Sequence, residues 1–188
     1  GWGIALLALT QVLIRAKHND KRHPVVTTLA LIMGWLGMAA YLIWLASDNA
    51  FALSFSRHAG IWWFMLPILL TVSHKMIPFF SSRVLDNYTL VRPYWALYFM
   101  LACTVLHGML ELVQQPQLLW LADLPLLACA LYFSYTWGLL RSFSIKLLAV
   151  LHVGFAWLSV AMLLYGVQSL MLFFTGSAPF GLAPLHAL

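Results

Sequence analysis

The sequence predicts an all-α membrane protein, a polytopic bundle of transmembrane helices. Of its 188 residues, 63% are hydrophobic and only 8% are charged, and the mean hydropathy is +0.90. Soluble domains carry roughly a quarter of their residues as charged side chains, so this composition excludes that class. Neither strand alternation nor a hairpin dipeptide separates the apolar runs, which favours helices over a β-barrel.

Six apolar runs define the expected elements, because a helix needs about 20 apolar residues to cross the hydrocarbon. The first run is too short to span alone, and the last is longer than a span requires. The chain opens inside an apolar run and closes on what resembles the first turn of another helix. We therefore expect one transmembrane helical domain over 1–188, a fragment of a longer protein with about six spans and the start of a seventh. The runs are 1–14, 24–46, 60–80, 94–113, 118–140 and 147–174.

The basic residues predict the orientation, since cytoplasmic loops carry the excess of Lys and Arg. Nine of the ten fall in or beside the first, third and fifth loops, which we expect on the cytoplasmic side. The second loop, 47–59, holds only Arg57. The net charge of +5 belongs to this topology, and no nucleic-acid binding is expected. The nine are Arg15, Lys17, Lys21, Arg22, Lys75, Arg83, Arg92, Arg141 and Lys146.

Four of the seven histidines lie within or at the start of predicted spans. Ionisable groups at membrane depth cost about 2.5–3.5 kcal/mol on insertion scales and usually carry function. We expect His74 and His152 in a cytoplasmic-side layer, and His107 and His186 in the outer half. Histidine is the commonest metal ligand and a haem-iron ligand, so all four are candidate ligands. A proton or substrate path and simple hydrogen bonding inside the bundle are the alternatives. The remaining histidines are expected solvated in the first loop (His18 and His23) or at the outer boundary (His58).

A soft-ligand stripe runs along the fourth predicted span. Met100, Cys103, His107 and Glu111 follow the helical spacing i, i+3, i+7, i+11 and share one face. Thioether, thiolate and imidazole are the ligands that copper prefers, so the stripe is a candidate copper site. Glu111 is alternatively a carboxylate that fixes the tautomer of His107. Ordinary packing toward the bundle is the third interpretation.

The third predicted span ends in a distinctive run, 73–83. Pro78 is expected to end or kink the helix, because it lacks a backbone donor. Arg83 would then lie at the cytoplasmic rim, where a guanidinium can pair with a haem propionate, or simply close a positively charged helix end. Arg141 and Lys146 are expected on the same side as His152.

Three segments in order resemble the NnrS family. The first is 74–83 with Val91-Arg92-Pro93, the second is 151–158 around His152, and the third is 184–188 with His186. They are similar to the family's Pro-Phe-Phe run, its His-x-Gly-aromatic-Ala-Trp segment and the start of its His-Ala-Leu helix. The likeness covers most of the chain from about Gly60 onward.

The resemblance implies a polytopic haem- and copper-containing membrane protein linked to nitric-oxide tolerance in denitrifying and related bacteria. It implies the bacterial inner membrane as location, nitric oxide as a small-molecule partner and an electron donor. Many members carry Gly-Arg where this chain has His74-Lys75. His152 and His186 therefore come before His74 as haem ligands, and segments outside this chain are expected to supply further histidines.

We therefore predict a haem-binding membrane protein that handles nitric oxide or protects from nitrosative stress, by redox chemistry or by binding at the haem. The residues predicted to hold the cofactor are His152, His186, His74 and Arg83, with His107 as a further metal ligand. A haem-dependent oxidoreductase is one form of this function. A transporter or proton-relay protein that uses its intramembrane histidines is the alternative, although no internal repeat or second helix break supports a transporter.

The orientation is testable by cysteine accessibility. Single cysteines introduced into the loops 16–23 and 81–93 should be labelled only from the cytoplasmic side, because these loops hold most of the basic residues. A membrane-impermeant thiol reagent applied to right-side-out and inside-out vesicles measures this, with a cysteine in 114–117 as the opposite-side control. Labelling of both basic loops from outside would overturn the orientation.

Overall fold

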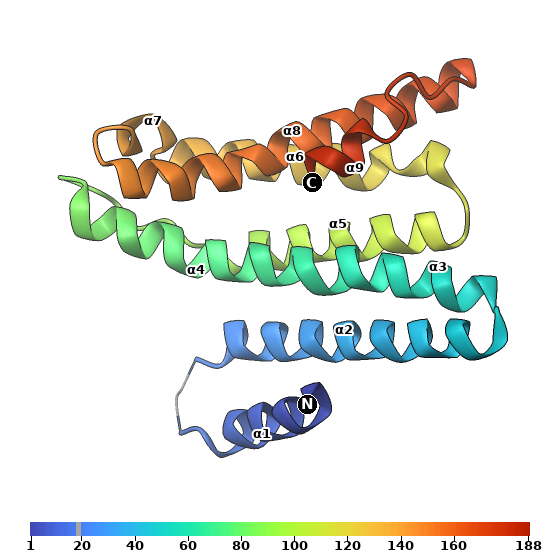
Figure 1. The fold of residues 1–188 in the computed structure, drawn as a ribbon. Coiled ribbons are helices and arrows are strands. Elements are labelled where there is room, and N and C mark those ends of the chain that lie inside the picture. Colours follow the sequence, from blue (N-terminus) through green and yellow to red (C-terminus); the bar gives the residue numbers. More distant parts are fainter. Residues whose placement is uncertain (18–19) are drawn as a thin grey trace. The chain divides into compact units, whose positions relative to one another are not determined.

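The computed structural model describes residues 1–17 and 20–188. The described residues form helices joined by turns and contain no strand, which confirms the all-α prediction (Figure 1). The chain divides into two compact units, Gly1–Val72 and Ser73–Leu188. The single domain expected over 1–188 stays a prediction.

The first unit is held together by a face of small residues on its longest helix. It contains α1 (Trp2–Arg15), α2 (Arg22–Ser47), α3 (Ala50–His58), a π-helical segment η1 (Ala59–Met65) and the first part of α4 (Leu66–Val84). Small side chains let helix backbones approach closely where lipid provides no hydrophobic drive. A Cβ atom on Gly34 would lie 2.7 Å from Cγ of Phe64, and one on Gly37 would lie 3.3 Å from Cβ of Ala59.

The second loop expected over 47–59 is wrong, because most of it is helical. Only two residues separate α2 from α3. Asp48 adopts φ 51° in the left-handed region, and the Asn49 side chain accepts a hydrogen bond of 3.1 Å from the backbone N–H of Ala52. This cap starts the helix ten residues earlier than the polar sequence around Arg57 had indicated. The helical stretch Ala50–Val84 is continuous over 35 residues.

Pro78 does not end its helix, so the expected helix end is wrong, while the alternative, a kink at Pro78, stays a prediction. The helix α4 continues through Pro78 to Val84. A proline removes one backbone hydrogen bond, and neighbouring helices and hydroxyl side chains make this tolerable inside transmembrane helices. Arg83 therefore stands in the last turn of α4, where a cation complements the helix dipole.

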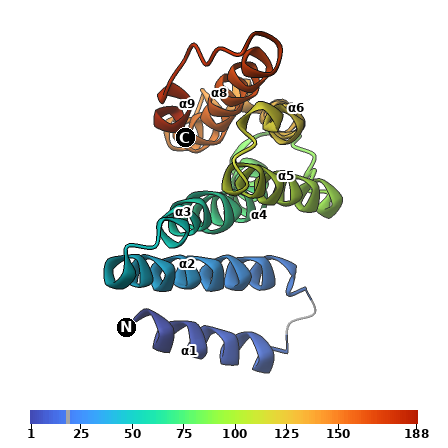
Figure 2. The same ribbon diagram turned by 90° about the vertical axis from the view of Figure 1, so that its right-hand side faces the viewer.

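The second unit is a bundle in which α6 and α8 pack against each other along their length (Figure 2). Gly166 of α8 makes this contact possible, since a Cβ atom there would lie 2.5 Å from Cδ2 and 3.0 Å from Cγ of Leu124. α5 packs on the other side of α6. Besides the end of α4, the unit comprises α5 (Tyr94–Leu112), η2 (Pro116–Leu118), α6 (Trp120–Thr136), α7 (Leu139–Ser142), α8 (Lys146–Thr175) and α9 (Ala183–Ala187).

Five helical stretches among the described residues are long and apolar enough to cross a membrane. The sequence had predicted about six. The difference is α1, whose 14 residues extend about 21 Å against a hydrocarbon core of about 30 Å. The residues expected to start a seventh span form the short helix α9, and the count of six to seven spans stays a prediction. The stretches are Arg22–Ser47, Ala50–Val84, Tyr94–Leu112, Pro116–Thr136 and Lys146–Thr175.

Two glycines of α8 provide a matched test of the α6–α8 contact. Gly166→Ala should lower the free energy of unfolding by about 1–3 kcal/mol, because the added methyl overlaps Leu124. Gly154→Ala should leave it unchanged or raise it, since a Cβ atom at Gly154 meets nothing within 4 Å. Denaturation of the detergent-solubilised protein by SDS measures both. Equal stability of the two variants would contradict the packing.

Candidate functional site

A buried imidazole–carboxylate pair joins α5 to α6. Nδ1 of His107 lies 2.5 Å from Oδ1 of Asp123, and both side chains are fully buried. Asp123 stands in the first turn of α6, where the positive end of the helix dipole favours a carboxylate. Burying two ionisable groups is tolerable only when they satisfy each other, so this contact is a strong constraint on how the two helices pack.

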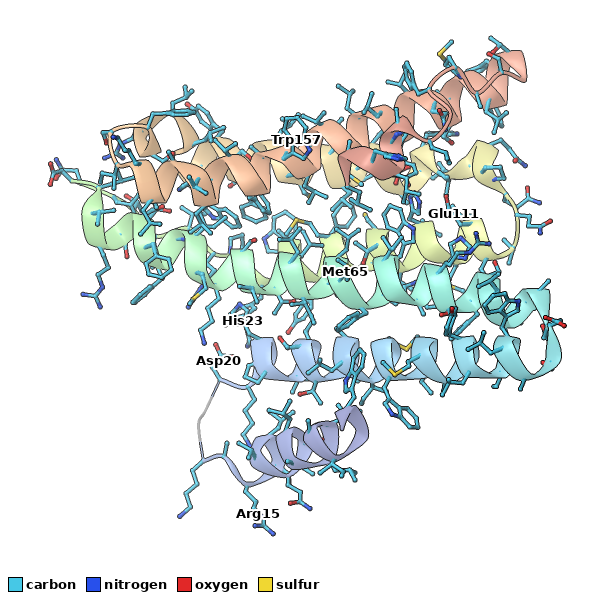
Figure 3. All side chains as sticks on the ribbon, in the orientation of Figure 1. Arg15, Asp20, His23, Met65, Glu111 and Trp157 are labelled. Carbon is cyan, nitrogen blue, oxygen red and sulfur yellow. The ribbon has the colours of Figure 1, made fainter. Side chains whose placement is uncertain are left out.

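Two further polar side chains surround the same ring. Oε1 of Glu111 lies 3.6 Å from Nε2 of His107, and the Glu111 side chain is 27% exposed at the end of α5 near the turn to α6 (Figure 3). The Tyr165 ring of α8 meets the imidazole edge-on, with 5.0 Å between ring centroids. Oδ2 of Asp123 is buried and has no hydrogen-bond partner among the described residues.

Sequence reasoning missed Asp123 and assigned its role to Glu111. The structure gives Nδ1 of His107 to Asp123 and places Glu111 on the opposite edge, at Nε2. A signal was present, because Asp123 is the one acidic residue inside the predicted span 118–140. The partnership itself depends on the packing of α5 on α6, which a single sequence does not reveal.

The expected stripe on α5 is buried, and its role as a copper site stays a prediction. Met100, Cys103 and His107 are all buried. Over residues 1–17 and 20–188, no three His, Cys, Asp or Glu side chains gather in a way that holds a metal ion. The two carboxylates near His107 lie on opposite ring nitrogens and so cannot share one ion with it. We therefore assign no copper ligands here.

A second buried polar contact joins α4 to α8. The hydroxyl of Ser81 and Nε2 of His152 lie 2.9 Å apart, and both residues are buried. Arg83 follows Ser81 by two residues and is exposed, with its guanidinium 5.2 Å from the centre of the Phe79 ring. Burial disfavours an imidazolium at this position, and the serine gives the neutral ring a hydrogen-bond partner. Ser81 is thus a site residue that the sequence did not single out.

His74 is buried within a cluster of aromatic rings from neighbouring helices. Its Nε2–H donates to the backbone carbonyl of Pro93 at 3.2 Å. The Trp137 ring lies 6.2 Å from His74 and 4.9 Å from Phe155, which follows His152 by less than one turn. His74 and His152 therefore share one end of the second unit, in agreement with the predicted common layer.

The remaining histidines lie apart from these contacts. His186 is exposed in α9, where its Nδ1–H donates to the carbonyl of Leu182 at 2.9 Å. Among the described residues, its ring contacts neither His107 nor His152 and pairs with its own helix instead. His23 is buried near the start of α2, so its expected solvation is wrong. His58 lies on α3 with Nδ1 3.3 Å from the Ser54 hydroxyl, and His18 lies outside the described residues.

Long apolar helices with imidazoles buried between them define a multi-pass helical membrane protein. The model of the NnrS protein family matches residues 1–188, the whole chain. The chain therefore belongs to the NnrS family, which confirms the resemblance seen in its three segments. No curated protein and no solved structure matches the chain.

Two neighbouring serines test the contact between α4 and α8. Ser81→Ala should cost about 1–3 kcal/mol of unfolding free energy, because it leaves the buried His152 nitrogen without a partner. Ser82→Ala should cost less than about 0.5 kcal/mol, since the exposed Ser82 hydroxyl donates only to the backbone carbonyl of Phe79 in its own helix. SDS denaturation in detergent compares them. A Ser81 effect no larger than that of Ser82 would argue against the contact.

Proposed function

We propose that this chain is a haem-binding integral membrane protein of the NnrS family, acting in nitric-oxide metabolism or in protection from nitrosative stress. The observation that carries the proposal is His152. Its imidazole is buried within an apolar span. The hydrogen-bond partner of the ring is a serine hydroxyl, which is uncharged and binds the ring nitrogen weakly. An imidazole at this depth without a charged partner is the group that a haem iron uses as an axial ligand.

The residues around His152 fit a haem on three counts. The ring offers Nε2, the nitrogen that faces Ser81, as the donor to the iron. Phe155 follows His152 by less than one helical turn on α8 and packs on Trp137, so these two rings offer an apolar wall for the macrocycle. Arg83 stands exposed near the end of α4 and is suited to pair with a propionate.

Each candidate residue has its own part in the proposal. His152 holds the iron, and Arg83 anchors the polar edge of the macrocycle, as Lys146 at the start of α8 also does. His186 is the second candidate ligand, although its exposure on α9 makes it a weaker one. His74 is third, because its Nε2 is engaged by Pro93 and aromatic rings pack around it. When bound, ferrous haem supplies an iron that takes nitric oxide as a ligand or passes an electron.

The proposal extends to location and partners. The five apolar helical stretches fit a lipid bilayer as their surroundings. We place the protein in the bacterial inner membrane, with nitric oxide or a related small molecule as substrate and a separate electron donor. A haem-dependent oxidoreductase is the enzymatic form of this function. The family resemblance also implies copper, for which we assign no ligands.

Haem ligation is tested with the full-length protein. His152→Ala should remove most of the Soret absorbance or change the spin state of the iron, and His186→Ala should have the same effect if it supplies the second ligand. His58→Ala is the control, because this histidine on α3 already pairs with Ser54. Absorption spectra of oxidised and reduced protein, with haem content per protein, are the measurements. Wild-type spectra and haem content in both single variants and in the double variant would refute the assignment.

A further inference from the structure

We propose that Glu111, His107 and Asp123 form a proton-exchange site, which carries a proton from the surface end of α5 to the buried carboxylate of Asp123. The three side chains lie in one row. Glu111 is partly exposed, His107 is fully buried and Asp123 is fully buried on the next helix. The site uses none of the residues assigned to haem, so it stands independently of that proposal.

The imidazole is suited to transfer because each of its nitrogens faces a different carboxylate. Nδ1 is 2.5 Å from Asp123, within hydrogen-bond distance. Nε2 is 3.6 Å from Glu111, a gap that a rotation of this partly exposed side chain or one bridging water closes. A ring held in this way accepts a proton at one edge and releases another at the opposite edge without turning over.

The transfer balances as a two-proton shift. Protonated Glu111 gives its proton to Nε2, and the Nδ1–H proton of the same ring moves to Oδ1 of Asp123. Glu111 ends as a carboxylate, Asp123 ends as a carboxylic acid, and His107 stays neutral with its proton on Nε2 instead of Nδ1. The sum of charges over the three residues is the same before and after, and the negative charge moves from the buried Asp123 to the partly exposed Glu111.

The surroundings favour this role over a purely structural tether. No Lys or Arg occurs in α5 or α6, and α8 has only Lys146 at its first residue, so these helices supply no fixed cation for Asp123 within the span. The titratable groups that face the pair are Glu111 and Cys103 from α5 and Tyr165 from α8. A proton is then the species that compensates the charge of Asp123.

The second carboxylate oxygen of Asp123, Oδ2, offers a route for the proton beyond the site. This oxygen is buried and has no hydrogen-bond partner among the described residues, whereas a structural carboxylate at such depth normally has both oxygens satisfied. A tether between α5 and α6 would need only the contact through Oδ1. The second oxygen is the point at which a proton leaves the site toward the interior.

The test follows the carboxylic acid of Asp123 by infrared difference spectroscopy of the full-length protein in liposomes. Wild-type protein should show a protonated-carboxyl band on titration that moves in D₂O and is lost in Asp123→Asn. This variant keeps an oxygen that accepts from Nδ1–H and so preserves folding. Glu111→Gln should keep the band but slow its hydrogen–deuterium exchange by about 10²-fold, the low end of what a positioned proton donor contributes.

Asp86→Asn, which changes a carboxylate in the loop between α4 and α5, is the matched control and should alter neither the band nor its exchange rate. A band that persists in Asp123→Asn, or the absence of any band that depends on Asp123, would overturn the proposal. So would exchange in Glu111→Gln as fast as in wild type, which is the result that a mere tether predicts.

Discussion

Hydrocarbon offers no hydrogen-bond partner, so a polar group that this chain places at membrane depth is stabilised mainly by contact with another part of the protein. His107 is held by Asp123, His152 by Ser81 and His74 by the carbonyl of Pro93. Each of these contacts joins elements that are distant in sequence. The polar groups therefore determine which helices are neighbours, and the small and apolar side chains fill the space that remains.

This constraint separates the second unit into two chemical ends. One end holds His74 and His152, with aromatic rings and a serine around them. The other holds His107 between two carboxylates. α8 contributes to both ends through His152 and Tyr165, which lie about 20 Å apart along the helix axis at 1.5 Å per residue. The proposed haem ligand and the proposed proton site thus occupy different depths of one bundle.

The two ends differ in the kind of partner they give an imidazole, and this difference separates their chemistry. The Ser81 hydroxyl brings no charge to the His152 ring, and an iron could take its place at Nε2. Two carboxylates on opposite edges make His107 a proton carrier, because charge is balanced whichever group holds the proton.

Composition and the order of short motifs predicted much of this protein. The scarcity of charges determined the membrane class, and the segments around Pro78, His152 and His186 indicated the family that matches the whole chain. Local sequence signals were misleading in two places, one a polar stretch and the other a proline. The Ser- and Arg-containing stretch before Ala59 suggested a loop, yet the cap at Asn49 starts a helix there, and Pro78 is accommodated within α4.

The sequence by itself determined the class and the family, because these depend on composition and on the order of short motifs. Only the tertiary structure decided the partners. Asp123 lies 16 residues from His107, and Ser81 lies 71 residues from His152. Spacing along a helix predicts which residues share a face, but which faces meet is decided by packing such as that of Gly166 on Leu124. The chemistry of a buried imidazole depends on what it meets, so it was decided only when the helices packed.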